Sequence, residues 1–202
     1  MKAKCPVPLL LVAVVLAIGA SDASGGEAPL CDGQPATIVG TPGHDVLDGT
    51  DQRDVISALA GADRVTGLDA RDRLCGGPGA DIVLGNLGND RLYGGPGRDV
   101  VRGLRGLDHL FGGSGADKVV GATGFDTMDG GADDDKLFGH GGSDRLFGGH
   151  GDDRLIGGRW NDHLFGEPGR DYLEGDDHFD VCAGGGDVDT EGPGCETVRG
   201  IP

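Results

Sequence analysis

Aspartates recur at a spacing of nine residues along most of this chain, and their carboxylates are the groups best suited to chemistry. The series comprises Asp45, Asp54, Asp63, Asp72, Asp81, Asp90, Asp99, Asp108, Asp117, Asp126, Asp135, Asp144, Asp153, Asp162, Asp171 and Asp180. Carboxylate and backbone carbonyl oxygens in flexible loops are hard ligands, which favour Ca²⁺ over Zn²⁺ or copper, while Mg²⁺ holds its waters too tightly for such a cage. We therefore expect these aspartates to bind calcium ions.

The aspartates belong to a nine-residue unit that begins at Gly40 and repeats sixteen times, through residue 183, without an insertion or deletion. Position 1 is glycine in every unit except that of Ala58, position 6 is always aspartate, and position 8 is apolar in every unit, ending with Cys182. Strand alternation places position 8 on one face and its neighbours on the other, so we expect position 8 to point inward.

Glycines at positions 1, 2 and 4 of the unit permit positive φ and allow the turn carbonyls to point at a common centre. We expect backbone ligands from Gly76, Gly77, Gly79, Gly94, Gly95, Gly97, Gly112, Gly113, Gly115, Gly130, Gly131, Gly148, Gly149 and Gly151.

The unit resembles the hemolysin-type nonapeptide G-G-x-G-x-D-x-U-x of the RTX proteins, a calcium-binding β-helix repeat. The resemblance covers about 70% of the chain. It implies an all-β fold, a right-handed parallel β-roll in which each unit is a six-residue turn followed by a three-residue strand. Two units then make one coil, which gives about eight coils plus end caps.

Two units per coil place the odd-numbered and even-numbered turns in two separate columns. Position 4 of the odd column is glycine everywhere except at Asp133, whereas the even column has Gln52, Ala70, Trp160 and His178 there. We therefore expect the odd-column sites to bind calcium more completely than the even-column sites.

The ends of the chain differ from its repeats. Residues 1–23 read as a secretory signal peptide, with Lys2 and Lys4 before the apolar run 9–18; an uncleaved membrane anchor is the alternative, although the run is shorter than the roughly 20 residues of a membrane span. We expect an N-terminal extension and capping strand at 24–39, the calcium-binding roll at 40–183 and a C-terminal cap at 184–202.

Four cysteines lie outside the leader, and an even number in an exported chain favours disulfides. Proximity favours Cys182 with Cys195, which leaves Cys31 to pair with Cys75 if the N-terminal tail folds down the side of the roll. Free thiols or a metal site are the alternative reading.

Composition narrows the function. The net charge of −17 argues against nucleic acid as a partner, because such a surface repels phosphates.

One inward side chain per nine residues cannot offset the entropy of ordering a glycine-rich chain, so we expect folding to require calcium. Position 9 is apolar through a central block, which indicates either β-propensity or a stripe for self-association or a cell-surface partner.

We expect a secreted calcium-binding β-roll that acts as a structural, adhesive or cell-surface module without catalysis. The alternative is a calcium-dependent stabilising or secretion module of an RTX-type enzyme or toxin, although the chain contains neither an HExxH nor a GxSxG motif. An ice-binding surface would need outward threonine ladders, and only Thr66 and Thr127 lie on the expected strands.

Overall fold

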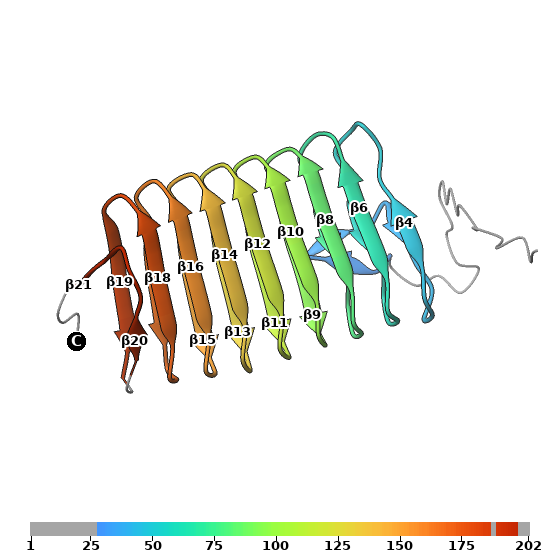
Figure 1. Ribbon diagram of the computed structural model, residues 1–202. Coiled ribbons are helices and arrows are strands. Elements are labelled where there is room, and N and C mark those ends of the chain that lie inside the picture. The colour runs from blue at the N-terminus through green and yellow to red at the C-terminus, as the bar shows by residue number, and fades with distance from the viewer. Residues whose placement is uncertain (1–27, 187–188, 198–202) are drawn as a thin grey trace, which may run out of the picture.

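The computed structural model describes residues 28–186 and 189–197, and its strands alternate between two parallel sheets that face each other across one core (Figure 1). The nine-stranded sheet contains β4 (Val46–Asp48), β6 (Arg64–Leu68), β8 (Ile82–Leu87), β10 (Val100–Arg105), β12 (Lys118–Thr123), β14 (Lys136–Gly141), β16 (Arg154–Arg159), β18 (Tyr172–Asp177) and β20 (Thr190–Glu191). The ten-stranded sheet contains β3 (Ile38–Val39), β5 (Val55–Ser57), β7 (Arg73–Cys75), β9 (Arg91–Pro96), β11 (His109–Ser114), β13 (Thr127–Ala132), β15 (Arg145–His150), β17 (His163–Glu167), β19 (Asp180–Gly185) and β21 (Cys195–Thr197).

The register confirms two units per coil. Val101 of β10 pairs with Val83 of β8 and with Val119 of β12, so successive coils are offset by 18 residues. The expected all-β parallel roll is therefore confirmed. Its two sheets form about nine coils, one more than the repeat count suggested, because strands outside the sixteen units add to both ends.

The core consists of the position 8 side chains of both sheets, as the alternation predicts. All but one of them are fully buried, and Leu47 in the first unit is 4% exposed. The cluster runs along the axis of the roll between the two sheets and also includes Ala58, and Ile38 and Cys195 pack against it at the two ends. Such a core is long but thin.

The strands are longer than the expected three residues. In the middle of the roll each strand has six residues, so positions 1 to 3 of the next unit continue the strand and only positions 4 to 6 turn the chain. The physical reason is stacking: Leu104 of β10 pairs with Asn86 of β8, and Arg105 pairs with Leu87, so the backbone pairing extends into the first half of the next unit.

Both ends of the roll depart from the repeat. At the N-terminus, β1 (Leu30–Cys31) and β2 (Gln34–Pro35) form an antiparallel pair, and only then does β3 enter the ten-stranded sheet beside β5. At the C-terminus β20 pairs with β18 and β21 with β19, so described residues of the expected C-terminal cap continue both sheets. The expected signal peptide, 1–23, lies outside the described residues.

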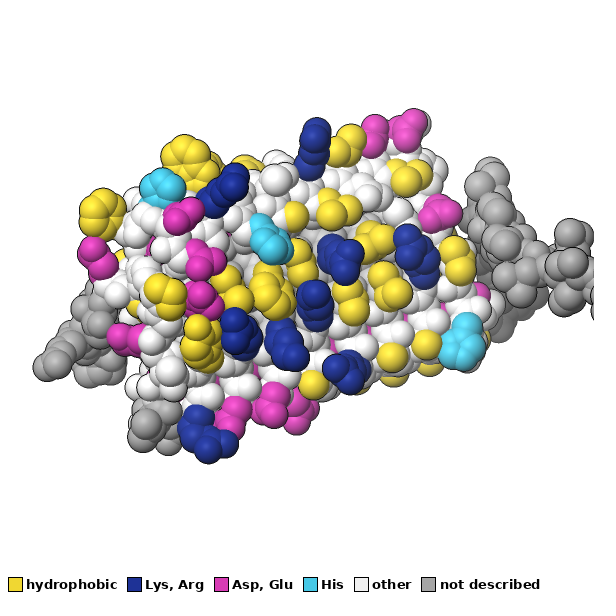
Figure 2. All heavy atoms as spheres, in the orientation of Figure 1, with side chains coloured by type: hydrophobic (Ala, Val, Ile, Leu, Met, Phe, Trp, Pro, Cys, Tyr) yellow, Lys and Arg dark blue, Asp and Glu magenta, His cyan; other side chains and the backbone are white. Residues whose placement is uncertain are grey.

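The outer face of the nine-stranded sheet carries basic and apolar side chains together (Figure 2). On β10 to β16, Arg102, Lys118, Lys136 and Arg154 lie in outward positions, and a shallow hollow of about 620 Å³ beside them is lined in part by Leu104. This face contrasts with the acidic character of the whole chain. Within the described residues there is no helix long and apolar enough to span a membrane.

Candidate metal centres

The repeated aspartates lie at the corners of the coils, where each turn ends and the next strand begins. Fifteen of the sixteen are buried, and Asp45 in the first coil is partly exposed. Carboxylates are rarely buried unless they are paired or bind a metal. Their burial therefore calls for an account of both oxygens of each carboxylate.

From Asp63 onward, one oxygen of each carboxylate accepts a hydrogen bond from the backbone of the preceding coil. In the first two units, Oδ2 of Asp45 and of Asp54 instead accepts from the N–H of Thr41 and of Thr50. The N–H of Asp63 donates to Oδ1 of Asp81 at 2.7 Å, and the N–H of Asp72 donates to Oδ1 of Asp90 at 2.8 Å. The same hydrogen bond recurs along both columns, as far as the N–H of Asp162 with Oδ1 of Asp180 in one and the N–H of Asp171 with Oδ1 of Asp189 in the other. The aspartates therefore form two ladders, in which each carboxylate accepts a hydrogen bond from the backbone N–H of the aspartate one coil earlier.

The other oxygen is buried without a hydrogen-bond partner. This holds for Oδ2 of Asp63, Asp72, Asp81, Asp90, Asp99, Asp108, Asp117, Asp126, Asp135, Asp144, Asp153, Asp162 and Asp180. A buried acceptor without a partner is costly, and native structures contain few of them. A regular series of such oxygens indicates a ligand that the protein atoms do not supply.

Position 1 glycines make room for these oxygens. A Cβ at Gly76 would lie 2.5 Å from Oδ2 of Asp81 and 2.7 Å from the carbonyl oxygen of Gly94. Oδ2 and a backbone carbonyl oxygen thus converge beside most position 1 glycines, whereas at Gly103, Gly121, Gly157 and Gly175 the three nearest atoms all belong to the aspartate side chain. The expectation that position 1 needs positive φ was wrong, because the glycine is required for space and the positive φ values fall at positions 2 and 4.

Irregular turn conformations at position 4 are more frequent in the even column, although Asp133 in the odd column also has φ of 77°. Gly79 at position 4 has φ of 156°, which essentially only glycine adopts, whereas Ala70, Trp160 and His178 in the even column have φ of 81°, 82° and 87°. The turns that contain Gly88, Gly106, Gly124 and Gly142 keep the glycine conformation in the middle of the even column. The irregular even turns therefore lie toward the two ends of the roll.

Comparison with known proteins agrees with this geometry. The model of the RTX calcium-binding nonapeptide repeat family, which spans four copies of the repeat, matches residues 39–74, 76–110, 93–128, 111–146, 129–159 and 161–191. The chain belongs to this RTX repeat family. No curated protein matches the chain. Membership shows that the roll is a calcium-binding structural module.

The donor set of the RTX repeats fits calcium. The atoms that converge are carboxylate and carbonyl oxygens, which are the ligands that Ca²⁺ prefers, in larger numbers than Mg²⁺ accepts. Among the described residues no three His, Cys, Asp or Glu side chains form a metal-binding group. Each site in the roll therefore combines few carboxylates with backbone carbonyl oxygens, and the aspartate Oδ2 and the glycine backbone are the groups that would hold the ion.

Burial changes the acid–base properties of the ladders. Desolvation raises the pKa of Asp99 to about 7, against the lowering effect of the N–H of Asp81, and the negative charges of Asp117 and Asp81 raise it further. Desolvation also raises the pKa of Asp135 to about 8. Calcium would favour the ionised carboxylates because an adjacent cation stabilises negative charge.

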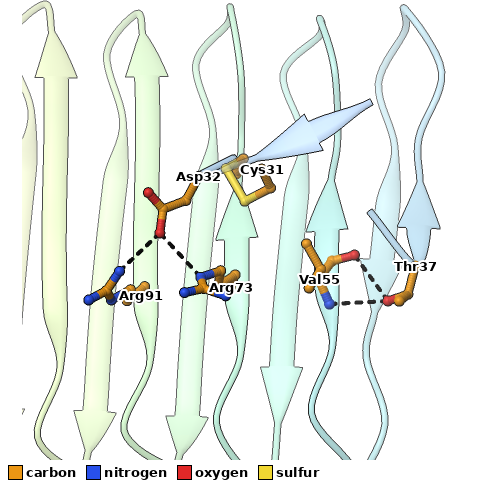
Figure 3. The surroundings of a disulfide bond; sticks show 7 residues. Cys31, Asp32, Thr37, Val55, Arg73 and Arg91 are labelled. Carbon is orange, nitrogen blue, oxygen red and sulfur yellow. Dashed lines mark hydrogen bonds and ion pairs between the residues drawn. A yellow bond between two sulfur atoms is a disulfide. The ribbon is translucent and has the colours of Figure 1, made fainter. Parts of the chain in front are cut away.

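Two disulfides hold the ends of the roll, and both pairings match the expected ones. Cys31 bonds Cys75 and Cys182 bonds Cys195, with Cα–Cα distances of 5.7 and 5.5 Å. The N-terminal tail reaches Cys75 as the antiparallel hairpin of β1 and β2, which crosses the outer face of the ten-stranded sheet (Figure 3).

Asp32, in the turn of that hairpin, was not expected to have a role. Its Oδ2 accepts from Nε of Arg73 at 3.2 Å and from Nη1 of Arg91 at 3.1 Å (Figure 3). Desolvation opposes ionisation of Asp32, but Arg91, Tyr93 and Arg73 together lower its pKa. Nothing in the local sequence pairs Asp32 with residues 41 and 59 positions away.

Proposed function

We propose that this protein is a secreted module whose β-roll folds as it binds several calcium ions, and that it acts in structure, adhesion or cell-surface contact without catalysis. The single observation that carries the proposal is the series of buried Oδ2 atoms without hydrogen-bond partners. In this proposal the sixteen aspartates and the turn glycines are the calcium ligands. Calcium binding then contributes directly to folding, because the unfolded chain has no assembled site.

Export is supported by the cysteines and the leader-like N-terminus. Disulfides persist in oxidising compartments, and the roll has two. We propose that residues 1–23 direct secretion, that 24–39 and 184–202 form the caps, and that 40–183 form the calcium-binding part. Extracellular calcium modules bind at about 10⁻⁴ to 10⁻³ M, so the chain would stay unfolded where calcium is scarce and fold outside.

Circular dichroism of the purified chain tests the proposal, first with chelator and then with millimolar Ca²⁺, with Mg²⁺ at the same concentration as the control. We expect strand signal to appear with Ca²⁺ and not with Mg²⁺. Equal strand signal in chelator would contradict calcium-dependent folding. Metal counting by mass spectrometry under native conditions would give the number of bound ions.

The two columns can be compared with matched double variants. We propose that Asp81→Asn with Asp99→Asn, in the odd column, raises the calcium midpoint more than Asp72→Asn with Asp90→Asn. Support comes from the non-glycine turn at Ala70, which adjoins the even pair. Equal shifts in the calcium midpoint would reject the difference between columns.

A second candidate function is a calcium-dependent stabilising or secretion module of an RTX-type enzyme or toxin. The observation that favours it is membership of the family, whose repeats accompany such proteins. Copurification of a hydrolase or membrane-lysis activity with the calcium-loaded chain separates the two candidates, because only the second predicts that a catalytic or pore-forming domain accompanies the roll.

A further inference from the structure

The outer face of the ten-stranded sheet carries a row of aromatic rings that is interrupted by one carboxylate. The row follows position 9 on β9 to β17. Its members are Tyr93, Phe111, Asp129, Phe147 and Phe165. Register places Phe111 directly beside Asp129 and Asp129 directly beside Phe147. Asp129 therefore stands where the other four members of the row have a ring.

The rings on either side of Asp129 form two stacked pairs. The centroids of Tyr93 and Phe111 are 4.8 Å apart with planes 3° from parallel, and those of Phe147 and Phe165 are 5.1 Å apart and 11° from parallel. These distances match the spacing of adjacent strands, about 4.7 to 4.9 Å. Phe111 and Phe147 are two strands apart, so about 10 Å separates their rings.

Asp129 has no hydrogen bond, ion pair or ring contact with any described residue, although it is only partly exposed. The faces of aromatic rings are negative, so a carboxylate between two ring faces is in an unfavourable field. A cation between the rings would be attracted both to the ring faces and to the carboxylate. A third ring would stack on the two rings but would not pair with the carboxylate.

We propose that Phe111, Asp129 and Phe147 form a slot for a planar cation, the guanidinium group of an arginine side chain on a partner protein. A cation midway between the two rings would lie about 5 Å from each centroid, within the roughly 6 Å range of cation–π attraction. Guanidinium stacks on aromatic faces and donates two parallel hydrogen bonds to a carboxylate, which an ammonium group cannot do. The slot lies on the strands and is distinct from the turns proposed to hold calcium.

The surroundings leave the slot accessible. On one side, the neighbouring outward position of each of the three strands is glycine, namely Gly113, Gly131 and Gly149. On the other side lie His109, Thr127 and Arg145. Arg145 is exposed and, among the described residues, makes no ion pair with Asp129. Its guanidinium is the intramolecular group that would compete for the slot.

The test is an NMR titration of the full chain in millimolar Ca²⁺, after circular dichroism has established that the roll is folded. The probe is N-acetyl-arginine amide, and the matched probe is N-acetyl-citrulline amide, which has a similar planar shape without the charge. We expect the arginine probe to shift the ring protons of Phe111 and Phe147 and the amide of Asp129. Equal shifts with the citrulline probe would overturn the proposal.

Variants of the protein locate the site. Asp129→Asn should weaken binding of the arginine probe about tenfold, because a charged hydrogen-bonded pair is lost. Asp129→Phe should complete the stacked row, keep the fold and abolish binding. Asp48→Asn makes the same charge change on the nine-stranded sheet and should leave the affinity unchanged.

Arg145→Gln should leave the affinity unchanged or increase it. Loss of binding in Arg145→Gln, or undiminished binding in Asp129→Phe, would place the ligand elsewhere and overturn the proposal. Either result would leave the calcium proposal intact, because the calcium ligands lie in the turns.

Discussion

The backbone N–H of Asp81 donates a hydrogen bond of 2.7 Å to Oδ1 of Asp99, which lies one coil further along the roll. The second oxygen of Asp99 is buried without a hydrogen-bond partner. It shares the space beside Gly94 with the carbonyl oxygen of Gly112, since a Cβ at Gly94 would lie 2.6 Å from both. One carboxylate therefore has a structural oxygen and an oxygen available to a cation.

This division predicts opposite effects of Asp99→Asn at low and at high calcium. Asparagine keeps the acceptor for the N–H of Asp81, and its amide can donate to the carbonyl of Gly112. We expect the variant to be more stable than the parent when little calcium is bound, and to gain less stability as calcium is added. Urea unfolding at the lowest calcium concentration that keeps the parent folded, and again in saturating calcium, measures both effects.

Asp99→Ala is the matched control, because it removes both oxygens and should destabilise the roll by about 1 to 3 kcal/mol under either condition. If Asp99→Asn and Asp99→Ala behaved alike, the two oxygens would not have separate roles.

The stability of the calcium-free roll should fall as pH rises. Burial raises the pKa of Asp99 and of Asp126 to about 7 and that of Asp135 to about 8, from an ordinary value of 3.8. Between these limits the folded chain binds more protons than the unfolded chain, so the free energy of unfolding decreases with increasing pH. The strand signal by circular dichroism in chelator at pH 5 and pH 8 measures the effect, and a stronger strand signal at pH 8 would contradict it.

Protons should also compete with calcium. Below about pH 7 the buried aspartates gain protons, and a protonated carboxylate is a poor ligand for Ca²⁺. We expect the calcium midpoint of folding to rise as pH falls from 8 to 6. A midpoint independent of pH across this window would show that the raised pKa groups are not the ligands.

Gly76→Ala should destabilise the roll by about 1 to 3 kcal/mol, because its Cβ would overlap Oδ2 of Asp81 and the carbonyl oxygen of Gly94. Gly43→Ala is the matched control, since the nearest atom to its Cβ would be Thr41 Oγ1 at 3.7 Å. Chemical unfolding in calcium gives both free energies. Similar values for the two variants would mean that position 1 is not limited by space.

Removing the N-terminal disulfide should cost more than removing the C-terminal one. Cys31 and Cys75 are separated by 44 residues, and Cys182 and Cys195 by 13. Loop-closure entropy then gives about 4 and about 3 kcal/mol for the two bridges. Unfolding of the two double serine variants in calcium measures the difference. A larger loss for Cys182→Ser with Cys195→Ser would mean that the C-terminal bridge also prevents fraying of β19 and β21.

The repeat made much of the architecture predictable. A period of nine with an apolar residue at position 8 indicates inward-facing strand centres, and the structure confirms the row from Leu47 to Cys182. Strand length was not predictable in the same way. Whether positions 1 to 3 form turn or strand depends on partners 18 residues away, and the sequence of a single unit does not specify them.

The sequence by itself determined the inward-facing apolar residue and the recurring aspartate of each unit, because both follow from a local pattern repeated in strict register, and its resemblance to the RTX repeat implied the parallel roll with two units per coil. Only the tertiary structure decided which oxygen of each aspartate is hydrogen-bonded and why position 1 is glycine. It also placed Asp129 between two aromatic pairs and Asp32 between two arginines. These relationships join atoms that are distant in the chain, and they exist only once the coils have stacked.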